Sequence, residues 1–396
     1  MDNKHEVVVV GGGYAGVMAA NRLTQRDDVR VRVINPRRVF VPRLRLHQLV
    51  GETHEAVVDY EDILAEQVEL VVDSVTRIDP AARTVVLDGG GEIAYDYLIY
   101  AVGSGIPTPP VPGAAEFAYP VATLEAAQRL RSVLLDTPMT ASVTVIGGGP
   151  TGVETAAELA EQGRKVTLVC GSSLVPYLHP KARRTAHKYL AKLGVAVIEG
   201  PEAAVTEVTR DAVRLGADWT LKSDLTIWTA GFGVPDLAGR SGLRTDAAGR
   251  LLTDETLTSV DDDRIIAAGD CSAPSDLPFR MSAYVAYCLG AQAADTLLAR
   301  LAGEQARPVD LAFPAMCLSF GRDAGIYQLG HKDETAMRLY FGGAVGKKLK
   351  EIACEAGIKH LAAEAKKPGS HRWFKDGTYR PARLRAQSDG TAVPVA

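Results

Sequence analysis

Residues 7–10 form a short run of valines that passes directly into a glycine-rich turn and then into helix-forming residues up to Leu23. A continuous run of β-branched residues is typical of a strand buried in a parallel sheet. The pattern therefore predicts a strand, a tight turn and a helix, which together make the first half of a βαβ unit.

The same pattern recurs further along the chain, where residues 143–146 lead into a second glycine-rich turn and a helix-forming stretch up to Leu159. At an offset of 136 residues, nine positions of the first copy are identical in the second: Val7, Val9, Gly11, Gly12, Gly13, Gly16, Val17, Ala20 and Leu23. A repeat of this unit predicts two dinucleotide-binding folds in one chain.

Three later segments, residues 95–104, 224–231 and 265–271, also have the pattern of buried strands that end in small residues. The last of them ends in Gly269 and Asp270. A carboxylate at this position accepts hydrogen bonds from a polyhydroxy chain such as ribityl, and the glycine lets a cofactor approach the backbone.

From Arg307 onwards the pattern changes. Residues 311–329 contain short apolar runs interrupted by Gly321 and Gly325, which is typical of antiparallel strands. A helical period follows over residues 344–366. Its apolar positions near one face are Val345, Leu349, Ile352, Ala356 and Leu361. This face has no aromatic residues, so we expect it to pack against the body of the protein or a second subunit rather than a bilayer.

Charge is unevenly distributed along the chain. The net charge is −4, which gives no reason to expect a nucleic-acid partner. Residues 344–396 nevertheless carry 11 Lys and Arg against 5 Asp and Glu. A basic tail of this kind is more often solvated or self-docking than bound to an anionic surface, and the Arg, Pro and Gly content after residue 368 is typical of a loosely ordered terminus.

Composition excludes several classes of protein. Apolar residues make up 46% and charged residues 23% of 396, which excludes disordered, collagen-like and disulfide-scaffold chains. The five cysteines are scattered, with no C-x-x-C and no metal-ligand pair, so we expect a reducing compartment and no metal. Because no basic leader or apolar run near 18 residues is present, we expect a cytoplasmic protein; peripheral membrane contact is left open but not favoured.

Both glycine-rich turns carry the G-x-G-x-x-G pattern that binds a dinucleotide. The first glycine makes the tight turn, the second admits the pyrophosphate and the third lets the helix pack on the strand. The acidic residue expected about 20 positions later, where it would hold a ribose, is Asn35 in the first unit and Cys170 in the second. Ser172 and Ser173 could donate to a 2′-phosphate, but no arginine sits beside them, so NADH versus NADPH stays open.

These ordered motifs resemble the two-dinucleotide-binding-domain flavoproteins of the pyridine nucleotide-disulfide reductase type, above all type II NADH dehydrogenases and apoptosis-inducing-factor-like oxidoreductases. The resemblance runs from about Glu6 to about Leu301. It implies an α/β fold with two Rossmann-like three-layer domains, the second inserted in the first, and a small α+β C-terminal domain. The implied boundaries are 1–110 and 250–305 for an FAD-binding domain, 111–249 for an NAD(P)H-binding domain, and 306–396 for a C-terminal interface domain.

The resemblance also implies which residues bind the cofactors FAD and NAD(P)H. Those for FAD are Gly11, Gly13, Tyr14, Ala15, Gly16, Asn35, Pro36, Arg43, Val75, Ala101, Gly103, Gly269, Asp270, Ser282 and Ala283. Those for NAD(P)H are Gly147, Gly149, Pro150, Thr151, Gly152, Glu154, Cys170 and Gly231. Ser282 is also expected to be the N-cap of the helix that follows it.

The implied activity is hydride transfer from NAD(P)H to FAD, followed by electron transfer to a quinone-like or other small-molecule acceptor. A redox disulfide is not expected, because C-x-x-C and C-x-x-x-x-C are both missing. Glu154 is where the family places a carboxylate near the nicotinamide, and its alternative role is that of an acid stabilised by the helix dipole. Arg45 and His47 lie in the segment that passes the flavin in the family, where they could polarise the acceptor or the reduced flavin. The alternative is that most arginines of this segment are solvated or bind the phosphates of FAD.

The helix after Ser282 departs from the family in one respect. Type II NADH dehydrogenases have glutamines that face the quinone, and here Tyr284 and Cys288 replace them. This change argues against reduction of a membrane quinone, and Tyr284 is a candidate contact for an aromatic substrate or a residue that fills the core.

Two alternative functions stay open from the sequence. The first is sulfide:quinone-type oxidation, which would need Cys288 and Cys317 on either side of the flavin. The second is a flavin- or NAD-bound sensor or interaction protein with slow turnover. A homodimer is also left open.

Overall fold

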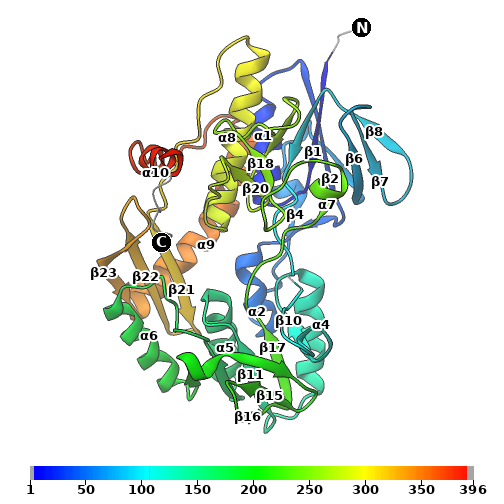
Figure 1. Cartoon of the computed structure of the whole chain (residues 1–396). Helices are drawn as coiled ribbons and strands as arrows, with labels where there is room; N and C mark the ends of the chain where they lie inside the picture. The colour runs from blue at the N-terminus through cyan, green and yellow to red at the C-terminus, as the bar shows by residue number, and fades with distance from the viewer. Residues whose placement is uncertain (1–3, 107, 390–396) are drawn as a thin grey trace.

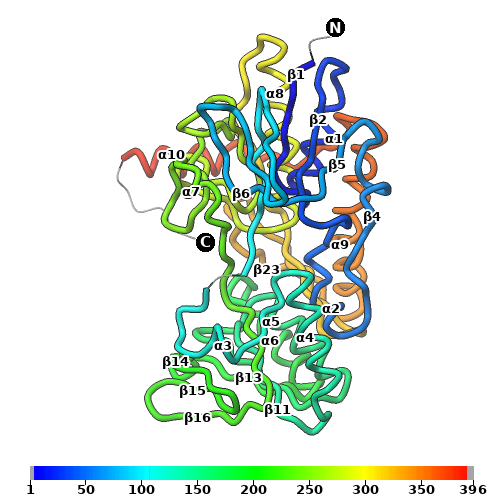
Figure 2. The backbone as a smooth tube through the Cα atoms, turned by 90° about the vertical axis from the view of Figure 1, so that its right-hand side faces the viewer, coloured from blue at the N-terminus to red at the C-terminus, as the bar shows by residue number. Residues whose placement is uncertain are grey.

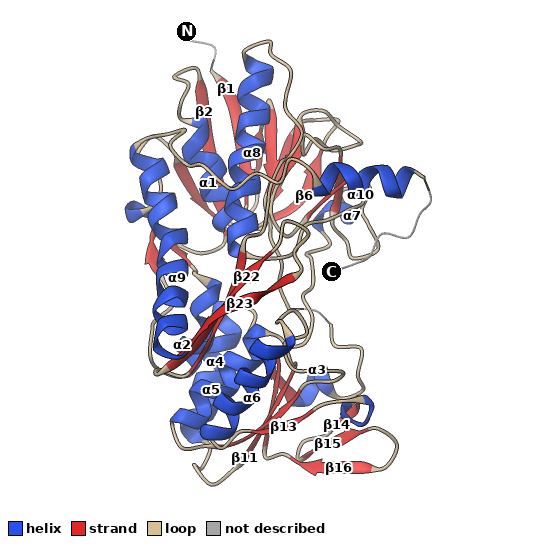
Figure 3. Ribbon diagram, turned by 90° about the vertical axis from the view of Figure 1, so that its left-hand side faces the viewer, coloured by secondary structure: helices blue, strands red, loops and turns tan. Residues whose placement is uncertain are grey.

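The computed structural model describes residues 4–106 and 108–389, and these residues form two lobes with helix α9 (Gly343–Lys366) beside their junction (Figures 1 and 2). Each lobe contains a parallel sheet with helices against one face and an antiparallel sheet on the other face (Figure 3). This arrangement confirms the predicted fold class of two Rossmann-like three-layer domains, the second inserted in the first, with a small α+β part after them.

The first parallel sheet has the strand order β19-β9-β1-β2-β5. Its strands are β1 (His5–Val10), β2 (Val29–Asn35), β5 (Glu69–Val72), β9 (Tyr97–Tyr100) and β19 (Ile265–Ala267). Strand β19 comes from far along the chain, and its parallel pairing with β9 shows that the chain returns to this sheet after leaving it. Strand β1, the strand predicted at the start of the first repeated unit, lies at the centre of this sheet.

Alternate valines of β1 build the two sides of this lobe. Val7 and Val9 belong to the core formed with α1 (Tyr14–Leu23) and α8 (Ala283–Leu301). Val8 and Val10 belong to the core on the opposite face. That face is covered by β6 (Val75–Asp79), β7 (Thr84–Leu87), β8 (Glu92–Ala94), β18 (Leu251–Thr253), β20 (Ser272–Pro274) and α7 (Leu237–Arg240). Burial of both faces explains the continuous apolar run.

The second parallel sheet repeats this plan with the order β10-β17-β11-β12-β13. Its strands are β10 (Ala118–Pro120), β11 (Ser142–Ile146), β12 (Lys165–Val169), β13 (Ala196–Ile198) and β17 (Leu225–Trp228). One face is covered by α4 (Leu124–Asp136), α5 (Pro150–Glu161) and α6 (Pro180–Lys192). The other is covered by α3 (Ala114–Phe117), η3 (Pro201–Ala203), β14 (Val205–Val208), β15 (Ala212–Leu215) and β16 (Trp219–Lys222).

Short elements connect the lobes between β2 and β5. They are β3 (Val39–Phe40), η1 (Arg43–Arg45), α2 (Leu46–Val50), β4 (Val58–Asp59) and η2 (Tyr60–Asp62). Helix α2 lies in the core of the second lobe, where Leu46, Leu49 and Val50 are buried with residues of α4 and α5. The segment predicted to pass the flavin therefore reaches from the first lobe to the second.

The third part of the chain is an antiparallel sheet followed by two helices. The sheet contains β21 (Ala315–Phe320), β22 (Ala324–Gly330) and β23 (Ala336–Gly342), and α10 (Tyr379–Ser388) follows α9. Strands β21 and β22 confirm the antiparallel pair predicted over residues 311–329, and α9 confirms the predicted helix. No helix of the described residues combines the length and the apolarity needed to cross a membrane.

The predicted inner face of α9 is wrong at Val345 and Ile352, although Leu361 of the same predicted face is buried. Val345 and Ile352 are more than half exposed, at 58% and 54%, whereas Gly346, Lys350 and Gly357 are buried. Close packing explains the difference, because a Cβ on Gly346 would lie 2.3 Å from Gly325 O and one on Gly357 would lie 3.0 Å from Tyr14 Cε1. The small residues let α9 approach its neighbours with this face, so Val345 and Ile352 point outward.

The tail after residue 368 is also more ordered than the sequence pattern indicates, as far as residue 389. Arg380 in α10 is buried, and its guanidinium donates to both carboxylate oxygens of Glu255, at 2.6 and 2.8 Å. Glu364 is fully buried and accepts hydrogen bonds from Gly369 N and His371 N, both at 2.7 Å. Buried charge-assisted hydrogen bonds hold the tail on the first lobe, so the self-docking alternative is correct for this part. Residues 390–396 of the predicted tail lie outside the described residues.

Candidate nucleotide-binding and redox site

Two glycines in each glycine-rich turn are required by the packing of the chain itself. Gly11 has a φ of 108°, and a Cβ there would lie 2.3 Å from Ala101 O. A Cβ on Gly16 would lie 1.8 Å from Gly11 O. The second turn repeats this contact, since a Cβ on Gly152 would lie 1.9 Å from Gly147 O. These contacts leave no room for a side chain at the tight turn or under the helix.

The middle glycine of each turn faces open space. Gly13 and Gly149 are the N-caps of α1 and α5, and among the described residues no atom lies within 4 Å of a Cβ added to either. The unpaired N–H groups and the positive end of the helix dipole favour an anionic group at such a position. The two turns therefore fit the diphosphates of two dinucleotides, one in each lobe.

Asn35 ends β2 and is bound to the first turn. Its Oδ1 accepts a hydrogen bond from Gly12 N at 3.1 Å, and its Nδ2 donates to Arg37 O at 2.9 Å. Tyr60, which the sequence did not single out, donates from its hydroxyl to Gly12 O at 2.7 Å. The carboxamide of Asn35 thus fixes the conformation of the turn. Pro36, the next residue, is exposed.

Arg43, Gly103 and Asp270 come together from three distant segments. Ser104 Oγ donates to Asp270 Oδ2 at 2.6 Å, and Arg43 Nη1 donates to Ser104 O at 2.9 Å. Burial raises the pKa of Asp270 even though Ser104 and the Arg43 guanidinium, 3.9 Å away, favour its charged form. Gly103 and Gly269 flank this group with φ values of 67° and 84°. The group combines a carboxylate acceptor with flexible backbone, as the sequence predicts for a polyhydroxy chain.

Glu154 lies in the first turns of α5 and is not a solvent-facing acid, because it is only 7% exposed. Its Oε1 accepts hydrogen bonds from Ser319 N at 2.9 Å and Lys350 Nζ at 2.6 Å. His47 Nδ1 lies 3.6 Å from Glu154 Oε2. A strand and a helix of the third part of the chain therefore meet the second Rossmann unit at this carboxylate.

Electrostatics hold this cluster in a defined charge state. Burial alone would raise the pKa of Glu154, but the Lys350 ammonium and His47 outweigh it, so the net shift is downward. The carboxylate in turn raises the pKa of Lys350 against the effect of burial. Burial lowers the pKa of His47 to about 4, so its ring is neutral at pH 7. Nε2 of this ring has no hydrogen-bond partner among the described residues.

Arg45 borders the cluster but points toward α9. Its Nη1 donates to Gln48 Oε1 at 2.8 Å and to Glu351 Oε2 at 3.0 Å. Hydrogen bonds from Lys347 and Arg45 outweigh burial and lower the pKa of Glu351 to about 2. The predicted catalytic candidates Glu154, His47 and Arg45 thus lie around one helix, α9.

The fourth candidate, Tyr284, lies under the C-terminal segment. Its hydroxyl accepts a hydrogen bond from Phe374 N at 3.3 Å, and its ring meets the ring of Phe313 edge-on. One turn further along α8, Cys288 Sγ lies 3.8 Å from His371 Nε2. Both residues that replace the family's glutamines therefore contact the tail.

The five cysteines are separate free thiols in the described residues. None of them forms a disulfide there. Burial raises the pKa of Cys317 to about 12 and also raises that of Cys288. Both thiols are therefore protonated near neutral pH and are poor nucleophiles.

The remaining predicted cofactor residues lie at strand ends and helix starts. They are Tyr14 and Ala15 at the start of α1, Pro150 and Thr151 at the start of α5, Ala283 at the start of α8, Ala101 after β9, Cys170 after β12, Gly231 after β17 and Val75 at the start of β6. Ser282 Oγ accepts a hydrogen bond from Val285 N at 3.1 Å, which confirms the predicted N-cap.

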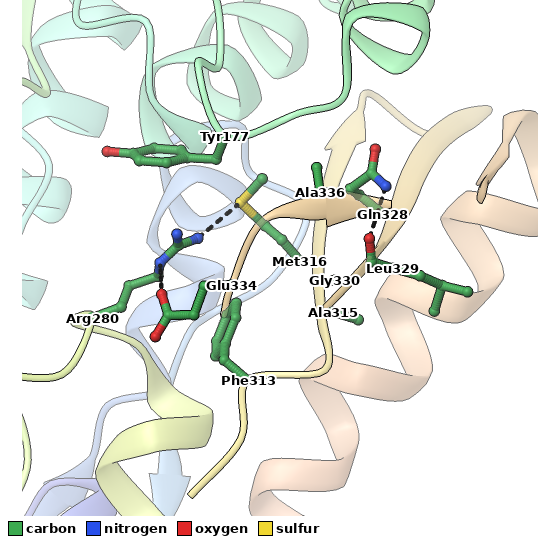
Figure 4. A pocket seen from close by; sticks show the side chains of 10 residues that line it. All are labelled: Tyr177, Arg280, Phe313, Ala315, Met316, Gln328, Leu329, Gly330, Glu334 and Ala336. Atoms are coloured by element: carbon green, nitrogen blue, oxygen red, sulfur yellow. Dashed lines mark hydrogen bonds and ion pairs between the residues drawn. The ribbon is translucent and has the colours of Figure 1, made fainter. Parts of the chain in front are cut away.

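Arg280, just before α8, links the two lobes to the third part of the chain (Figure 4). Its guanidinium carbon lies 4.8 Å from the ring centre of Tyr177 in the second lobe and 5.1 Å from that of Phe313. Nε of the same guanidinium lies 3.1 Å from Glu334 Oε2. The Arg280 guanidinium is therefore attracted by two aromatic rings. One of them, that of Tyr177, belongs to the loop that follows β12.

The sequence matches the family model of the pyridine nucleotide-disulphide oxidoreductases over residues 5–290. An NADH dehydrogenase-like protein of Mycobacterium tuberculosis is 31% identical over 294 residues, covering 67% of this chain and 72% of that protein. The type II NADH:quinone oxidoreductase of the same organism is 28% identical over 319 residues, covering 69% and 68%.

Solved structures of low sequence identity share the fold. NDH2 of Plasmodium falciparum in complex with NADH is 16% identical with a TM-score of 0.77, covering 93% of this chain and 99% of that one. The sulfide:quinone oxidoreductase of Aquifex aeolicus is 19% identical with a TM-score of 0.75, covering 92% and 93%. The fold described above is thus that of known two-dinucleotide oxidoreductases.

Proposed function

Since the chain belongs to the pyridine nucleotide-disulphide oxidoreductase family and is an NAD(P)H-dependent flavoprotein oxidoreductase, we propose that its electrons pass from reduced FAD directly to a quinone-like or other small-molecule acceptor. Quinone reductases among its relatives support the class of acceptor. The protonated, unpaired thiols support a route without a dithiol.

The two cofactors occupy the two lobes in this proposal, within the domain boundaries given by the sequence. Gly13 and the group of Arg43, Ser104 and Asp270 hold FAD, and Gly149 holds the diphosphate of NAD(P)H. When bound, FAD supplies the chemistry of hydride acceptance and electron release. The protein supplies binding, orientation and the electrostatic environment.

The buried pair of Glu154 and Lys350 is the observation that carries the proposal. Glu154 follows the second glycine-rich turn by one helical turn, where a nicotinamide held at that turn extends toward the other lobe. Because Lys350 donates to Oε1 at 2.6 Å, the carboxylate keeps one orientation. Oε2 and the neutral ring of His47 are left to orient the nicotinamide.

Anaerobic titration of the purified yellow protein with NADH and with NADPH tests the central step. We expect at least one nucleotide to bleach the flavin, and a panel of quinones to reoxidise it faster than air. A protein that purifies without flavin, or that neither nucleotide bleaches, would overturn the proposal. Slow turnover with a long-lived flavin–NAD charge-transfer complex would instead favour a sensor.

Matched variants test the carboxylate. Glu154→Gln should slow flavin reduction at least about tenfold, because the hydrogen bonds that orient the reacting ring change. Glu158→Gln is the control, since Glu158 is also a buried acid of α5 but contacts Thr53 instead of Lys350. Equal rates in the two variants would remove Glu154 from the mechanism.

Cytoplasmic location stays a prediction, a homodimer stays open, and peripheral membrane contact stays open but not favoured.

A further inference from the structure

The end of β12 is where the second Rossmann fold reads the adenosine ribose of its nucleotide. Folds of this type usually carry an acid there that binds the 2′-hydroxyl, whereas a nearby arginine accommodates a 2′-phosphate. In this chain the position is Cys170, which has neither charge. The residue type at the strand end therefore does not decide between NADH and NADPH.

A carboxylate from the neighbouring strand lies at this place. Glu199 directly follows β13, and its Oε2 accepts a hydrogen bond from Leu174 N at 2.7 Å, in the loop that begins at Cys170. The two strand ends are held together, since Gly200 N donates to Gly171 O at 2.8 Å. Burial and the Glu199 charge both raise the pKa of the Cys170 thiol, to about 12. The missing acid is thus supplied by the next strand.

The nearby cations do not form a phosphate site. Residues 170–179 contain no lysine or arginine. His187 Nε2 lies 3.3 Å from the other Glu199 oxygen, Oε1. Arg183 Nη2 donates to Pro176 O at 3.0 Å and to Leu178 O at 3.4 Å, so this guanidinium is bound to backbone carbonyls of the loop. The charge that faces an incoming ribose is that of the carboxylate.

We propose that Glu199 determines the nucleotide specificity: it accepts a hydrogen bond from the 2′-hydroxyl of NADH and repels the 2′-phosphate of NADPH. This inference rests on the proposed function, because it assumes that the second turn binds the nicotinamide nucleotide. A 2′-phosphate carries a charge of about −1.5 to −2 at pH 7 and would meet a fixed carboxylate with no arginine to offset it. The chain is therefore an NADH-dependent enzyme.

Calorimetric titration of the flavin-loaded protein with oxidised NAD and NADP tests the inference without any turnover. We expect NAD to bind at least about tenfold more tightly than NADP in the wild type. Glu199→Gln should reduce this ratio to about threefold or less, mainly through tighter NADP binding. Glu202→Gln removes the same charge from an exposed residue of η3 and should leave the ratio unchanged.

Two further measurements separate a change in specificity from a damaged loop. Reduced nicotinamide mononucleotide lacks the adenosine half, so its rate of flavin reduction should be equal in the wild type and Glu199→Gln. Adding Cys170→Asp to Glu199→Gln returns an acid to the strand end and should restore the preference for NAD. Equal affinities for NAD and NADP in the wild type, or equal ratios in the Glu199 and Glu202 variants, would overturn the inference. Nucleotide binding without flavin reduction would overturn the proposed function alone.

Discussion

Lys350 Nζ lies 2.6 Å from Glu154 Oε1, and both residues are almost completely buried. The ammonium comes from α9 and the carboxylate from α5, so one ion pair joins the last long helix to the start of the second Rossmann helix. Two buried opposite charges are tolerated only when they face each other and their remaining hydrogen-bonding positions are filled. Ser319 N fills one of these positions.

Lys350→Met should destabilise the protein by about 3–5 kcal/mol, because it leaves the Glu154 carboxylate buried and uncompensated. Urea unfolding followed by fluorescence measures the loss. The double variant Lys350→Met with Glu154→Gln should recover most of it, since neither charge is then left alone. A double variant no more stable than Lys350→Met would show that the loss comes from packing rather than from the unpaired charge.

Stability should fall as the pH is lowered from about 6.5 to about 4. His47 has a pKa of about 4 in the folded protein and an ordinary pKa of 6.5, so the unfolded chain takes up a proton in this window and the folded protein does not. The difference contributes on the order of 3 kcal/mol. The pKa of Glu154 is also lowered, so this residue adds a further loss of stability below its ordinary pKa of 4.5.

His47→Asn should flatten this part of the pH profile, as measured by urea midpoints at pH 5 and pH 7. His331→Asn is the control, since His331 is exposed. If stability changed equally with pH in His47→Asn and the wild type, the conclusion that the buried His47 ring stays neutral would be wrong. Burial also lowers the pKa of His371, to about 4, and the pKa values of His54 and His360, so these residues contribute to the slope that is left.

Gly11→Ala and Gly13→Ala should separate folding from flavin binding. The first places a Cβ against Ala101 O at a positive φ, so the flavin-free protein should lose about 1–3 kcal/mol or more. The second places a Cβ in open space at a helix N-cap, so stability should change by no more than about 1 kcal/mol. Flavin affinity should nevertheless fall, because this methyl group occupies the diphosphate cradle. Fluorescence titration with FAD would contradict this if Gly13→Ala bound like the wild type.

Cys288→Ser and Cys317→Ser should each keep at least about half of the quinone reductase activity. Neither thiol is ionised near neutral pH, and neither is bonded to a second cysteine. Alanine variants at both positions control for the polarity of serine in a buried site. Loss of activity in both the serine and alanine variants, with consumption of sulfide by the wild type, would instead support sulfide:quinone-type oxidation.

The parts of the site that depend on local geometry could be predicted from the sequence. Gly11 and Gly147 need positive φ values and close backbone contacts, and such positions are visible as glycines after a valine run. Ser282 is likewise visible as an N-cap, because its hydroxyl acts within its own first turn. The positive φ and the N-cap are set within a few residues, although the backbone that packs on Gly11 comes from Ala101.

The partners contributed by other elements could not be predicted. Lys350 reaches Glu154 only because α9 is rotated so that its glycines face inward, and the aliphatic residues Val345 and Ile352 suggest the opposite rotation. Glu199 substitutes for an acid that the motif expects at Cys170, and only the pairing of β12 with β13 places it there. Both residues act across a tertiary contact that periodicity along one element does not encode.

The position of Lys350 so late in the chain has a consequence for biosynthesis. Translation runs from the N-terminus, so both Rossmann units leave the ribosome before α9 does. During that interval a nascent chain has the Glu154 carboxylate but not the ammonium that makes its burial favourable. A chain that ends before α9 therefore carries the Glu154 carboxylate without its buried cationic partner.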